Sequence, residues 1–332
     1  MNNTTATPPV GASRTSRRDL LITAATTSME QPGLSRRRFL ETSLTLSAAF
    51  LAASAGQSAP QTQAGGAWQI GCYTRPWSEY DWRVALDAIA EAGFKYAGMM
   101  TTNTKTRLVI SAATTVDEAR SIGEECRKRG LKVPSVYGGG FDVAKSLEAG
   151  IEDLKRLIDN CAACGAANLM VGGTDNAKLV EAYYKAVTEV CDYAAAKRID
   201  LSVKPHGGQN STGPQCRKIV EKVGKKNFGL WYDPGNIFYY SNGELDPVND
   251  AATVDGIVVG MSVKDFRLPK EVMVTPGTGK VNFQAVMARL KQGGFTRGPL
   301  IVECLENGDL TKLAAEAKKA RLFLEQLLGQ EA

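Results

Sequence analysis

The chain has 332 residues, a formal net charge of +5 and a hydrophobic content of 43%. These values suit one large globular domain with a real core, or two smaller domains. Its seven cysteines are too few for a disulfide-stabilised scaffold.

Residues 1–66 differ in composition from the rest of the chain, because they are rich in Ser, Thr, Ala and Arg. Residues 35–40 read S-R-R-R-F-L, and an uncharged run at 42–55 ends in small residues. A basic segment followed by an apolar run and a small-residue end is typical of an export signal. The paired arginines before Phe-Leu resemble a twin-arginine signal, which implies export of a folded protein to the periplasm or another extracytoplasmic space.

The apolar run at 42–55 is shorter than a transmembrane helix requires. We therefore predict that residues 1–66 are a signal and linker and that the mature protein has no membrane span. A weaker copy of the basic motif, SRRDLL, lies upstream of Met29. One hypothesis is that Met29 is the true start of the protein.

Removing the signal brings the charge close to neutral. Residues 1–55 contain six arginines and three acidic residues, so of the net charge of +5 only +2 remains on the rest. That balance lacks the basic footprint of a nucleic-acid-binding protein, and we expect no nucleic-acid partner.

From Trp68 onward, short apolar segments ending in polar or glycine residues alternate with amphipathic stretches. The apolar segments lie at 68–77, 95–102, 131–140, 167–174, 200–208, 228–237, 255–266 and 298–306. Eight strand–helix units within 67–330 predict a single α/β domain, a (β/α)8 barrel, which typically has about 250 residues. The competing open sheet usually has a glycine-rich turn after its first strand, and CYTRPW has none.

Cys161 and Cys164 form a CxxC inside the helix-like stretch GIEDLKRLIDNCAACGA. We interpret them as buried helix residues rather than as a redox or metal pair.

Polar side chains gather where the predicted strands end. They are Tyr73 and Arg75 (first strand), Lys204 and His206 (fifth), Asp233 and Asn236 (sixth), Ser262 and Lys264 (seventh) and Glu303 (eighth). Barrel active sites lie at these ends, and residues two apart share one face of a strand. We predict Lys204, His206, Asp233 and Glu303 as catalytic residues and Tyr73, Arg75, Asn236, Ser262 and Lys264 as substrate-binding residues.

Simpler interpretations exist for some of these residues. Arg75 and Lys264 could reach solvent, and Asp233, which precedes Pro-Gly, could be a turn residue. Glu303 interrupts the apolar run PLIVECL, and a buried carboxylate there needs a cationic partner or a metal.

The motifs PHGG, YDPGN, VKD, GxG-V-N-F and GPLIVE occur in this order between residues 68 and 328. This pattern resembles the sugar phosphate isomerase/epimerase group of xylose-isomerase-like TIM barrels. The resemblance implies a divalent metal on four strand-end ligands, and carboxylates that move a proton next to a sugar carbonyl. Asp233 and Glu303 match two of those ligands. Lys204 stands in place of a glutamate, and Ser262 in place of the histidine of H-V-K-D.

Three interpretations follow from this altered ligand set. In the first, the enzyme uses no metal. The Lys204 ammonium polarises a carbonyl between Asp233 and Glu303, while His206 or a carboxylate moves the proton. A Schiff base on Lys204 is a variant of this route that needs a lowered pKa.

In the second interpretation, Asp233, Glu303, His206 and water hold Mg²⁺ or Mn²⁺ weakly. In the third, the barrel binds a sugar or sugar acid without turnover, and Arg75, Lys204 and Lys264 meet its carboxylate or phosphate. A lysine beside a divalent cation is unfavourable, which favours the first. A multi-zinc endonuclease site is excluded, because the chain has only one histidine.

An extracytoplasmic location favours a free or oxidised sugar over a sugar phosphate as the small-molecule partner. The stretch GTGKVNF at 277–283 offers two further alternatives, backbone N–H groups that bind an anion or a flexible loop beside the site. The sequence gives no indication of oligomeric state.

Overall fold

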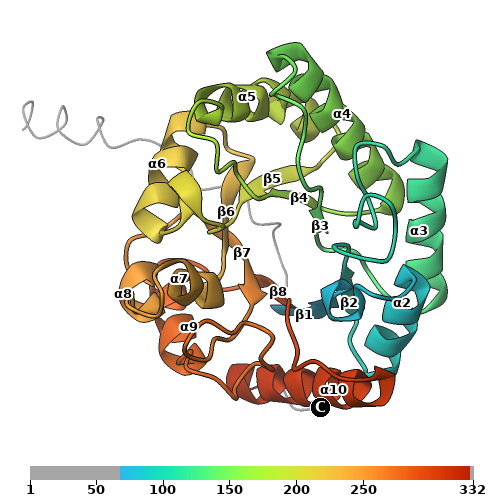
Figure 1. Cartoon of the computed structure of the whole chain (residues 1–332), viewed down its shortest axis with the longest axis vertical. Helices are drawn as coiled ribbons and strands as arrows, with labels where there is room; N and C mark the ends of the chain where they lie inside the picture. Colours follow the sequence, from blue (N-terminus) through green and yellow to red (C-terminus); the bar gives the residue numbers. More distant parts are fainter. Residues whose placement is uncertain (1–67, 330–332) are drawn as a thin grey trace, which may run out of the picture. The chain divides into compact units, whose positions relative to one another are not determined.

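Residues 68–329 of the chain are described by a computed structural model, in which helices surround a ring of strands (Figure 1). The predictions for the signal and for Met29 concern residues outside this range. Among the residues described, no helix is long and apolar enough to cross a membrane.

Eight parallel strands form the sheet. They are β1 (Trp68–Tyr73), β2 (Tyr96–Gly98), β3 (Val136–Tyr137), β4 (Asn168–Val171), β5 (Asp200–Val203), β6 (Phe228–Tyr232), β7 (Val258–Val263) and β8 (Gly298–Val302). Their order is β2-β1-β8-β7-β6-β5-β4-β3. Parallel bridges from Tyr96 to Lys132 and from Met99 to Val136 connect the two ends. The sheet is thus a nearly closed barrel, and the predicted (β/α)8 fold is confirmed.

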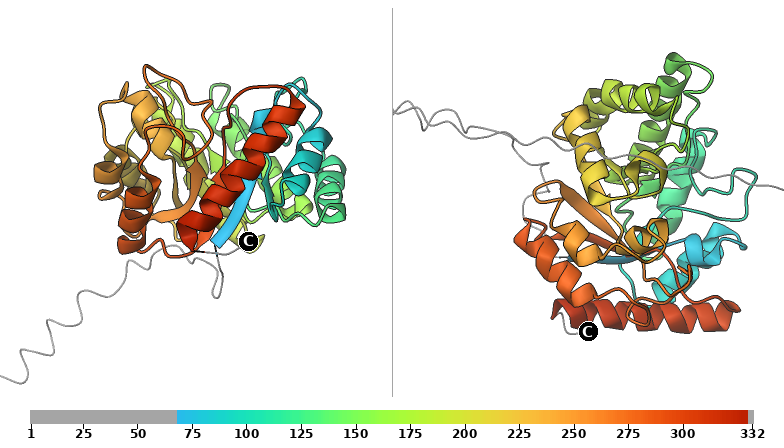
Figure 2. Two further views of the ribbon diagram at one scale, coloured as in Figure 1. Left: turned by 90° about the horizontal axis from the view of Figure 1, so that it is seen from below. Right: turned by 60° about the vertical axis from the view of Figure 1, so that its left-hand side comes forward.

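The helices lie outside the strands. They are α2 (Trp82–Glu91), α3 (Val116–Lys128), α4 (Leu147–Cys164), α5 (Val180–Ala196), α6 (Gly213–Val223), α7 (Pro234–Tyr240), α8 (Pro247–Ala251), α9 (Phe283–Gln292) and α10 (Leu310–Leu328), with short 3₁₀ turns η1 (Arg75–Trp77) and η2 (Gly208–Asn210). Figure 2 shows α10 running alongside β1. Each strand–helix unit of the prediction is present.

Helix α4 illustrates why the apolar periodicity identified the helices. Leu154, Leu157, Ile158 and Cys161 share one face of this helix and have no exposed surface. Burial raises the pKa of the nearby Cys164 thiol to about 12, and both cysteines are free and buried. The interpretation of the CxxC as packed helix residues is confirmed.

Helix α7 was not expected, because YDPGNI was assigned to the end of a strand. Asp233 is the N-cap, and its Oδ1 accepts a hydrogen bond of 2.9 Å from the Asn236 backbone N–H. Pro234 follows at the first helical position, where its missing N–H costs nothing. The chain therefore turns into a helix immediately after Asp233, and this fixes the direction of its carboxylate.

Side chains fill the interior of the barrel. A separate apolar cluster there consists of Tyr73, Met100, Met170, Trp231 and Ile301. Two glycines leave room for its aromatic rings. A Cβ at Gly98 would lie 2.2 Å from the Tyr73 ring, and one at Gly260 would lie 2.4 Å from Trp231. The polar residues at the strand ends therefore lie next to a layer of packed apolar side chains inside the barrel.

Candidate active site

Five charged side chains meet at the carboxyl ends of neighbouring strands. Arg75 follows β1, Lys204 follows β5, Asp233 follows β6, Lys264 follows β7 and Glu303 follows β8. These strands are consecutive in the sheet order, and their parallel direction places their ends at one edge. We call these five residues the ion-pair cluster, and all five were predicted as site residues.

Each lysine of the cluster bridges both carboxylates. Lys204 Nζ lies 2.9 Å from Asp233 Oδ2 and 2.6 Å from Glu303 Oε2. Lys264 Nζ lies 3.1 Å from Asp233 Oδ2 and 2.6 Å from Glu303 Oε1. Asp233 Oδ2 is held by these charge contacts without a well-directed hydrogen bond. Because the lysine and carboxylate side chains are at most 2% exposed, water screens these interactions little.

The carboxylates keep Lys204 charged, and the lysines keep Glu303 charged. Burial would lower the pKa of Lys204, but Asp233 and Glu303 outweigh burial and raise that pKa. Burial would raise the pKa of Glu303, but Lys204, Lys264 and Arg75 hold it well below its usual range. A Schiff base on Lys204 requires a lowered pKa, and the raised pKa of this buried, ion-paired lysine disfavours that route.

Asn236, in α7, forms hydrogen bonds to Lys264 and to the segment that follows β5. Lys264 Nζ donates to Asn236 Oδ1 at 3.0 Å, and Asn236 Nδ2 donates to the Pro205 carbonyl at 2.6 Å. The alternative that Lys264 reaches solvent is wrong, because its side chain is 2% exposed. Asp233 caps α7 and also forms ion pairs with both lysines. The alternative that Asp233 is only a turn residue is therefore incomplete.

Arg75 is the accessible cation of the cluster. Its Nη1 donates to Glu303 Oε1 at 2.9 Å, and its side chain is 32% exposed. The alternative that Arg75 simply reaches solvent is therefore correct only in part.

His206 lies beyond Lys204, half-buried between two aromatic rings. Its ring centroid is 6.2 Å from that of Tyr137 and 6.0 Å from that of Tyr240. We call these three residues the aromatic wall. Burial, together with the charges of Lys204 and Lys264, lowers the pKa of His206 to about 4. The imidazole is therefore neutral at pH 7 and can accept a proton or a hydrogen bond.

Tyr73 and Ser262 lie inside the barrel with no exposed surface. Neither hydroxyl has a satisfied hydrogen bond within residues 68–329. Their predicted contact with a substrate stays a prediction.

The cluster does not fit the divalent metal that the motif pattern implies. Within residues 68–329 no group of three or more His, Cys, Asp or Glu side chains could hold a metal ion. The Lys204 and Lys264 ammonium groups lie 2.6–3.1 Å from both carboxylates. A divalent cation beside Asp233 and Glu303 would meet both positive charges at short range.

Asp265 was not identified from the sequence. This fully buried carboxylate accepts hydrogen bonds of 2.8–3.0 Å from the backbone N–H groups of Phe266, Gly277, Gly279 and Val281. The N–H groups of the GTGKVNF stretch therefore bind an anion, but that anion is the chain's own side chain. An aspartate directly after the site lysine in VKD, with G-x-G twelve residues on, is the signal that could have indicated it.

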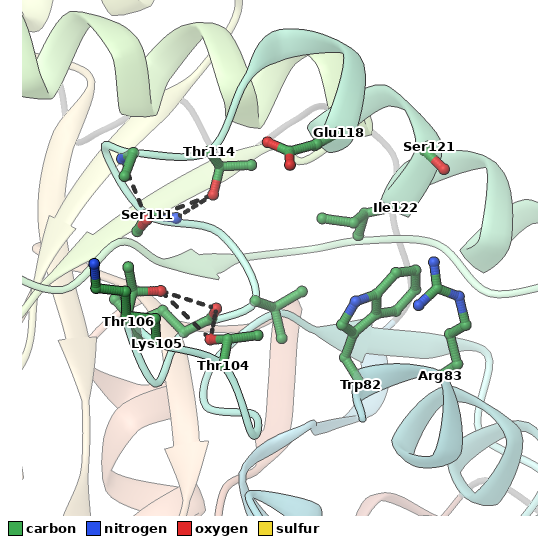
Figure 3. A pocket seen from close by; sticks show the side chains of 13 residues that line it. Trp82, Arg83, Thr104, Lys105, Thr106, Ser111, Thr114, Glu118, Ser121 and Ile122 are labelled. Carbon is green, nitrogen blue, oxygen red and sulfur yellow. Dashed lines mark hydrogen bonds between the residues drawn. The ribbon is translucent and has the colours of Figure 1, made fainter. Parts of the chain in front are cut away.

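A hollow lies beside α2, α3 and the loop after β2 (Figure 3). Its volume is about 350 Å³, and it contains none of the predicted site residues. The Arg83 guanidinium covers the Trp82 ring at 4.1 Å. The hydroxyls of Thr104 and Thr106 donate to the Leu108 carbonyl, and those of Ser111 and Thr114 contact each other. The hollow's polar groups are therefore largely satisfied within the chain.

The family model for the xylose isomerase-like TIM barrel matches residues 86–327. The chain belongs to this family.

Three proteins are similar to this chain in sequence or in structure. Over 139 residues the chain is 29% identical to a probable L-ribulose-5-phosphate 3-epimerase from Mycoplasma pneumoniae, a match that covers 40% of this chain and only 43% of that relative. D-allulose 3-epimerase from Methylomonas sp. in complex with D-allulose has a TM-score of 0.61 at 19% identity, over 79% of this chain and 98% of that structure. A xylose isomerase-like TIM barrel protein from Mycobacterium smegmatis in complex with magnesium has a TM-score of 0.63 at 18% identity, over 79% and 98%.

Proposed function

We propose that the protein is a sugar isomerase or epimerase that moves a proton next to a carbonyl and does so without a metal. The observation that carries the proposal is the pair of ammonium groups, Lys204 and Lys264, bridging Asp233 and Glu303 at 2.6–3.1 Å. Epimerases among the similar proteins support the reaction class, although the curated relative is matched over less than half of its length.

Removing a proton next to a carbonyl places negative charge on the carbonyl oxygen. Preorganised cations that face this oxygen stabilise the resulting enediolate more than the neutral substrate, and thereby lower the barrier. Lys204 and Lys264 are held in position by four charge contacts, so little reorganisation is needed when the charge develops. The two carboxylates serve mainly to orient and retain these cations.

His206 is the residue we assign to proton movement. Glu303 is a poor base, because three cations hold its pKa well below the usual range. The His206 imidazole has a pKa lowered to about 4 by burial and by the charges of Lys204 and Lys264, so it is neutral at pH 7. It is half-buried and, unlike Glu303, it forms no ion pair among the described residues that would occupy its basic nitrogen. It can take the proton from one carbon and return it to the neighbouring carbon for isomerisation, or to the same carbon for epimerisation, which also needs return to the opposite face.

A second candidate function is sugar binding without turnover. Its specific support is the saturation of both carboxylates by lysines, which removes the carboxylate base implied for the family. The two functions predict the same ligands but differ in whether a carbon-bound proton is exchanged.

The test is solvent exchange. The purified protein, treated with EDTA, is incubated in D₂O with a panel of ketoses, aldoses and sugar acids, and ¹H NMR follows loss of the proton next to the carbonyl. We expect exchange in at least one compound and no increase on adding Mg²⁺ or Mn²⁺. Binding without exchange would establish the second function, and exchange that requires metal would overturn the metal-free mechanism.

Two variants give the test its control. His206→Gln keeps a hydrogen-bonding side chain at a half-buried position and should reduce exchange by about 100-fold or more, the size of a general-base contribution. Lys225→Gln changes a partly exposed lysine that pairs with Asp192 and should leave exchange unchanged. Equal exchange in both variants would remove His206 from the mechanism.

A further inference from the structure

We infer that the substrate is a sugar acid and that Arg75 binds its carboxylate. This inference rests on the proposed function and names the substrate class of the same site.

The ion-pair cluster carries one positive charge more than its own acids neutralise. Three basic side chains, Arg75, Lys204 and Lys264, surround only Asp233 and Glu303. An unbalanced charge in a largely buried site is costly unless a ligand or solvent compensates it. A monoanionic ligand brings the formal sum to zero.

Arg75 is the member of the cluster that an entering ligand meets. The lysine and carboxylate side chains are at most 2% exposed, whereas that of Arg75 is 32% exposed. Among the described residues, only Nη1 of its guanidinium has a side-chain partner, Glu303 Oε1. The remaining N–H groups keep the forked geometry that matches a carboxylate with two parallel hydrogen bonds.

The other side of the site fixes the orientation of the ligand. The aromatic wall, Tyr137, His206 and Tyr240, includes the end of β5, which is four strands from β1 in the sheet order. The exposed Asp175 lies near this wall, since burial and, to a smaller extent, its charge raise the pKa values of Tyr137 and Tyr240. Its Oδ1 lies 3.0 Å from where a Cβ of Gly208 would be. Asp175 repels an anion and accepts hydrogen bonds from hydroxyls. The carboxylate therefore points to Arg75, and the hydroxylated chain points to the wall.

The same charge count distinguishes a carboxylate from a phosphate monoester. A phosphate monoester is close to a dianion at pH 7, so it would replace one excess positive charge with nearly one excess negative charge. The cluster thus matches a sugar acid better than a sugar phosphate.

The experiment is titration calorimetry on the EDTA-treated full chain with D-glucuronate and D-gluconate, with D-glucose and D-fructose, and with fructose 6-phosphate. We expect at least one acid to bind about 10- to 100-fold more tightly than the neutral sugars, the range for hydrogen bonds to a charged partner. Equal affinities for acids and neutral sugars, or tightest binding of the phosphate, would overturn the inference.

Variants then assign the effect to Arg75. Arg75→Gln should bring the acid-to-neutral ratio of dissociation constants close to one, and Arg75→Lys should restore part of it. Arg107→Gln, which removes an exposed arginine paired with Glu79, is the matched control and should keep the ratio. If Arg75→Gln weakens acids and neutral sugars by the same factor, Arg75 is structural and the assignment fails.

The failure of this inference and that of the proposed function are separable in the exchange assay. Neutral sugars that exchange their proton as well as acids would leave the function standing and refute the substrate class. Sugar acids that bind through Arg75 but never exchange their proton would leave the substrate class standing and refute the proposed function.

Discussion

At the scale of single residues, Lys204 contributes most to the poor fit between this cluster and the divalent metal that the motifs imply. Lys204 puts an ammonium group between Asp233 and Glu303, at 2.9 and 2.6 Å. The interaction of a unit charge with another about 4 Å away is about 4 kcal/mol near a protein surface, and it is larger for a divalent ion. The poor fit of the cluster to a divalent metal therefore comes from the Lys204 and Lys264 ammonium groups together with serine at position 262, where the motif pattern implies a histidine.

Restoring both family residues should create a metal site. We predict that the double variant Lys204→Glu, Ser262→His binds Mn²⁺ at least about 100-fold more tightly than the unmodified protein, because one repulsive charge is removed and two ligands are added. Mn²⁺ electron paramagnetic resonance measures the free ion directly. The single variant Lys204→Gln removes the charge without adding ligands and should show a smaller gain. Tight Mn²⁺ binding by the unmodified protein would contradict the proposal that the site works without a metal.

The pH dependence of His206 is a second prediction at this scale. Its pKa is lowered to about 4 from the usual 6.5, so the imidazole is neutral above about pH 5 and becomes protonated only below that. We expect kcat/KM to be flat from about pH 5 to neutrality and to fall as the pH drops through about 4. A fall in kcat/KM with a midpoint near pH 6.5 would mean that His206 is not desolvated, or is not the base.

Nuclear magnetic resonance can check this pKa independently of activity. His206 is the only histidine in the chain, so its ring-proton titration is unambiguous. Lys204→Gln removes one of the positive charges that oppose protonation and should move the titration toward higher pH. An unchanged midpoint would mean that Lys204 does not contribute and would leave burial, the largest cause, and Lys264 to account for the shift.

At the scale of elements, the loop between β7 and α9 depends on Asp265. Its carboxylate accepts four backbone hydrogen bonds, three of them from Gly277, Gly279 and Val281. A Cβ at Gly279 would lie 2.4 Å from Asp265 Oδ1, so the loop can approach this closely only with glycine there. Asp265 directly follows Lys264, and the same anchor holds the loop next to the ion-pair cluster.

We predict that Asp265→Asn loosens this loop without unfolding the barrel. The amide keeps one acceptor oxygen and loses the other, at a cost of about 1–3 kcal/mol for the N–H groups left unpaired. Hydrogen exchange of the Gly277 and Gly279 amides should become about 10- to 100-fold faster, while strand amides stay protected. Asp246→Asn, which alters the exposed cap of α8, should leave the loop unchanged. Unchanged exchange in Asp265→Asn would mean that other contacts hold the loop.

The sequence predicted elements better than it predicted contacts. Period and strand-end polarity located all eight strands and brought the five cluster residues together, because parallel strands align their carboxyl ends. The prediction missed α7, since Asp-Pro-Gly is compatible with both a turn and a helix start. It also missed Asp265, because three N–H groups from a loop that begins twelve residues later converge on it only in three dimensions. That both lysines bridge both carboxylates depends on side-chain reach, which strand alternation does not determine.

At the scale of the whole molecule, the cysteines bear on the proposal that the protein is exported. All seven cysteines of the chain lie within the described residues and are free and buried. In an oxidising space, exposed thiols would be open to oxidation and mispairing, whereas thiols buried before export are protected. A barrel of this kind is thus suited to a route that exports folded proteins, as the twin-arginine resemblance of residues 35–40 implies.

We therefore propose export through the arginine pair and predict its dependence on those residues. Replacing Arg36 and Arg37 together by Lys should retain the protein in the cytoplasm, because a twin-arginine signal is recognised by its arginines and not by charge alone. Cell fractionation in a bacterial host with this pathway measures the distribution. The same replacement of Arg17 and Arg18, in the upstream SRRDLL, also preserves the charge and should leave export intact. Export that survives the first replacement and fails with the second would place the functional signal upstream of Met29, and would also refute Met29 as the start.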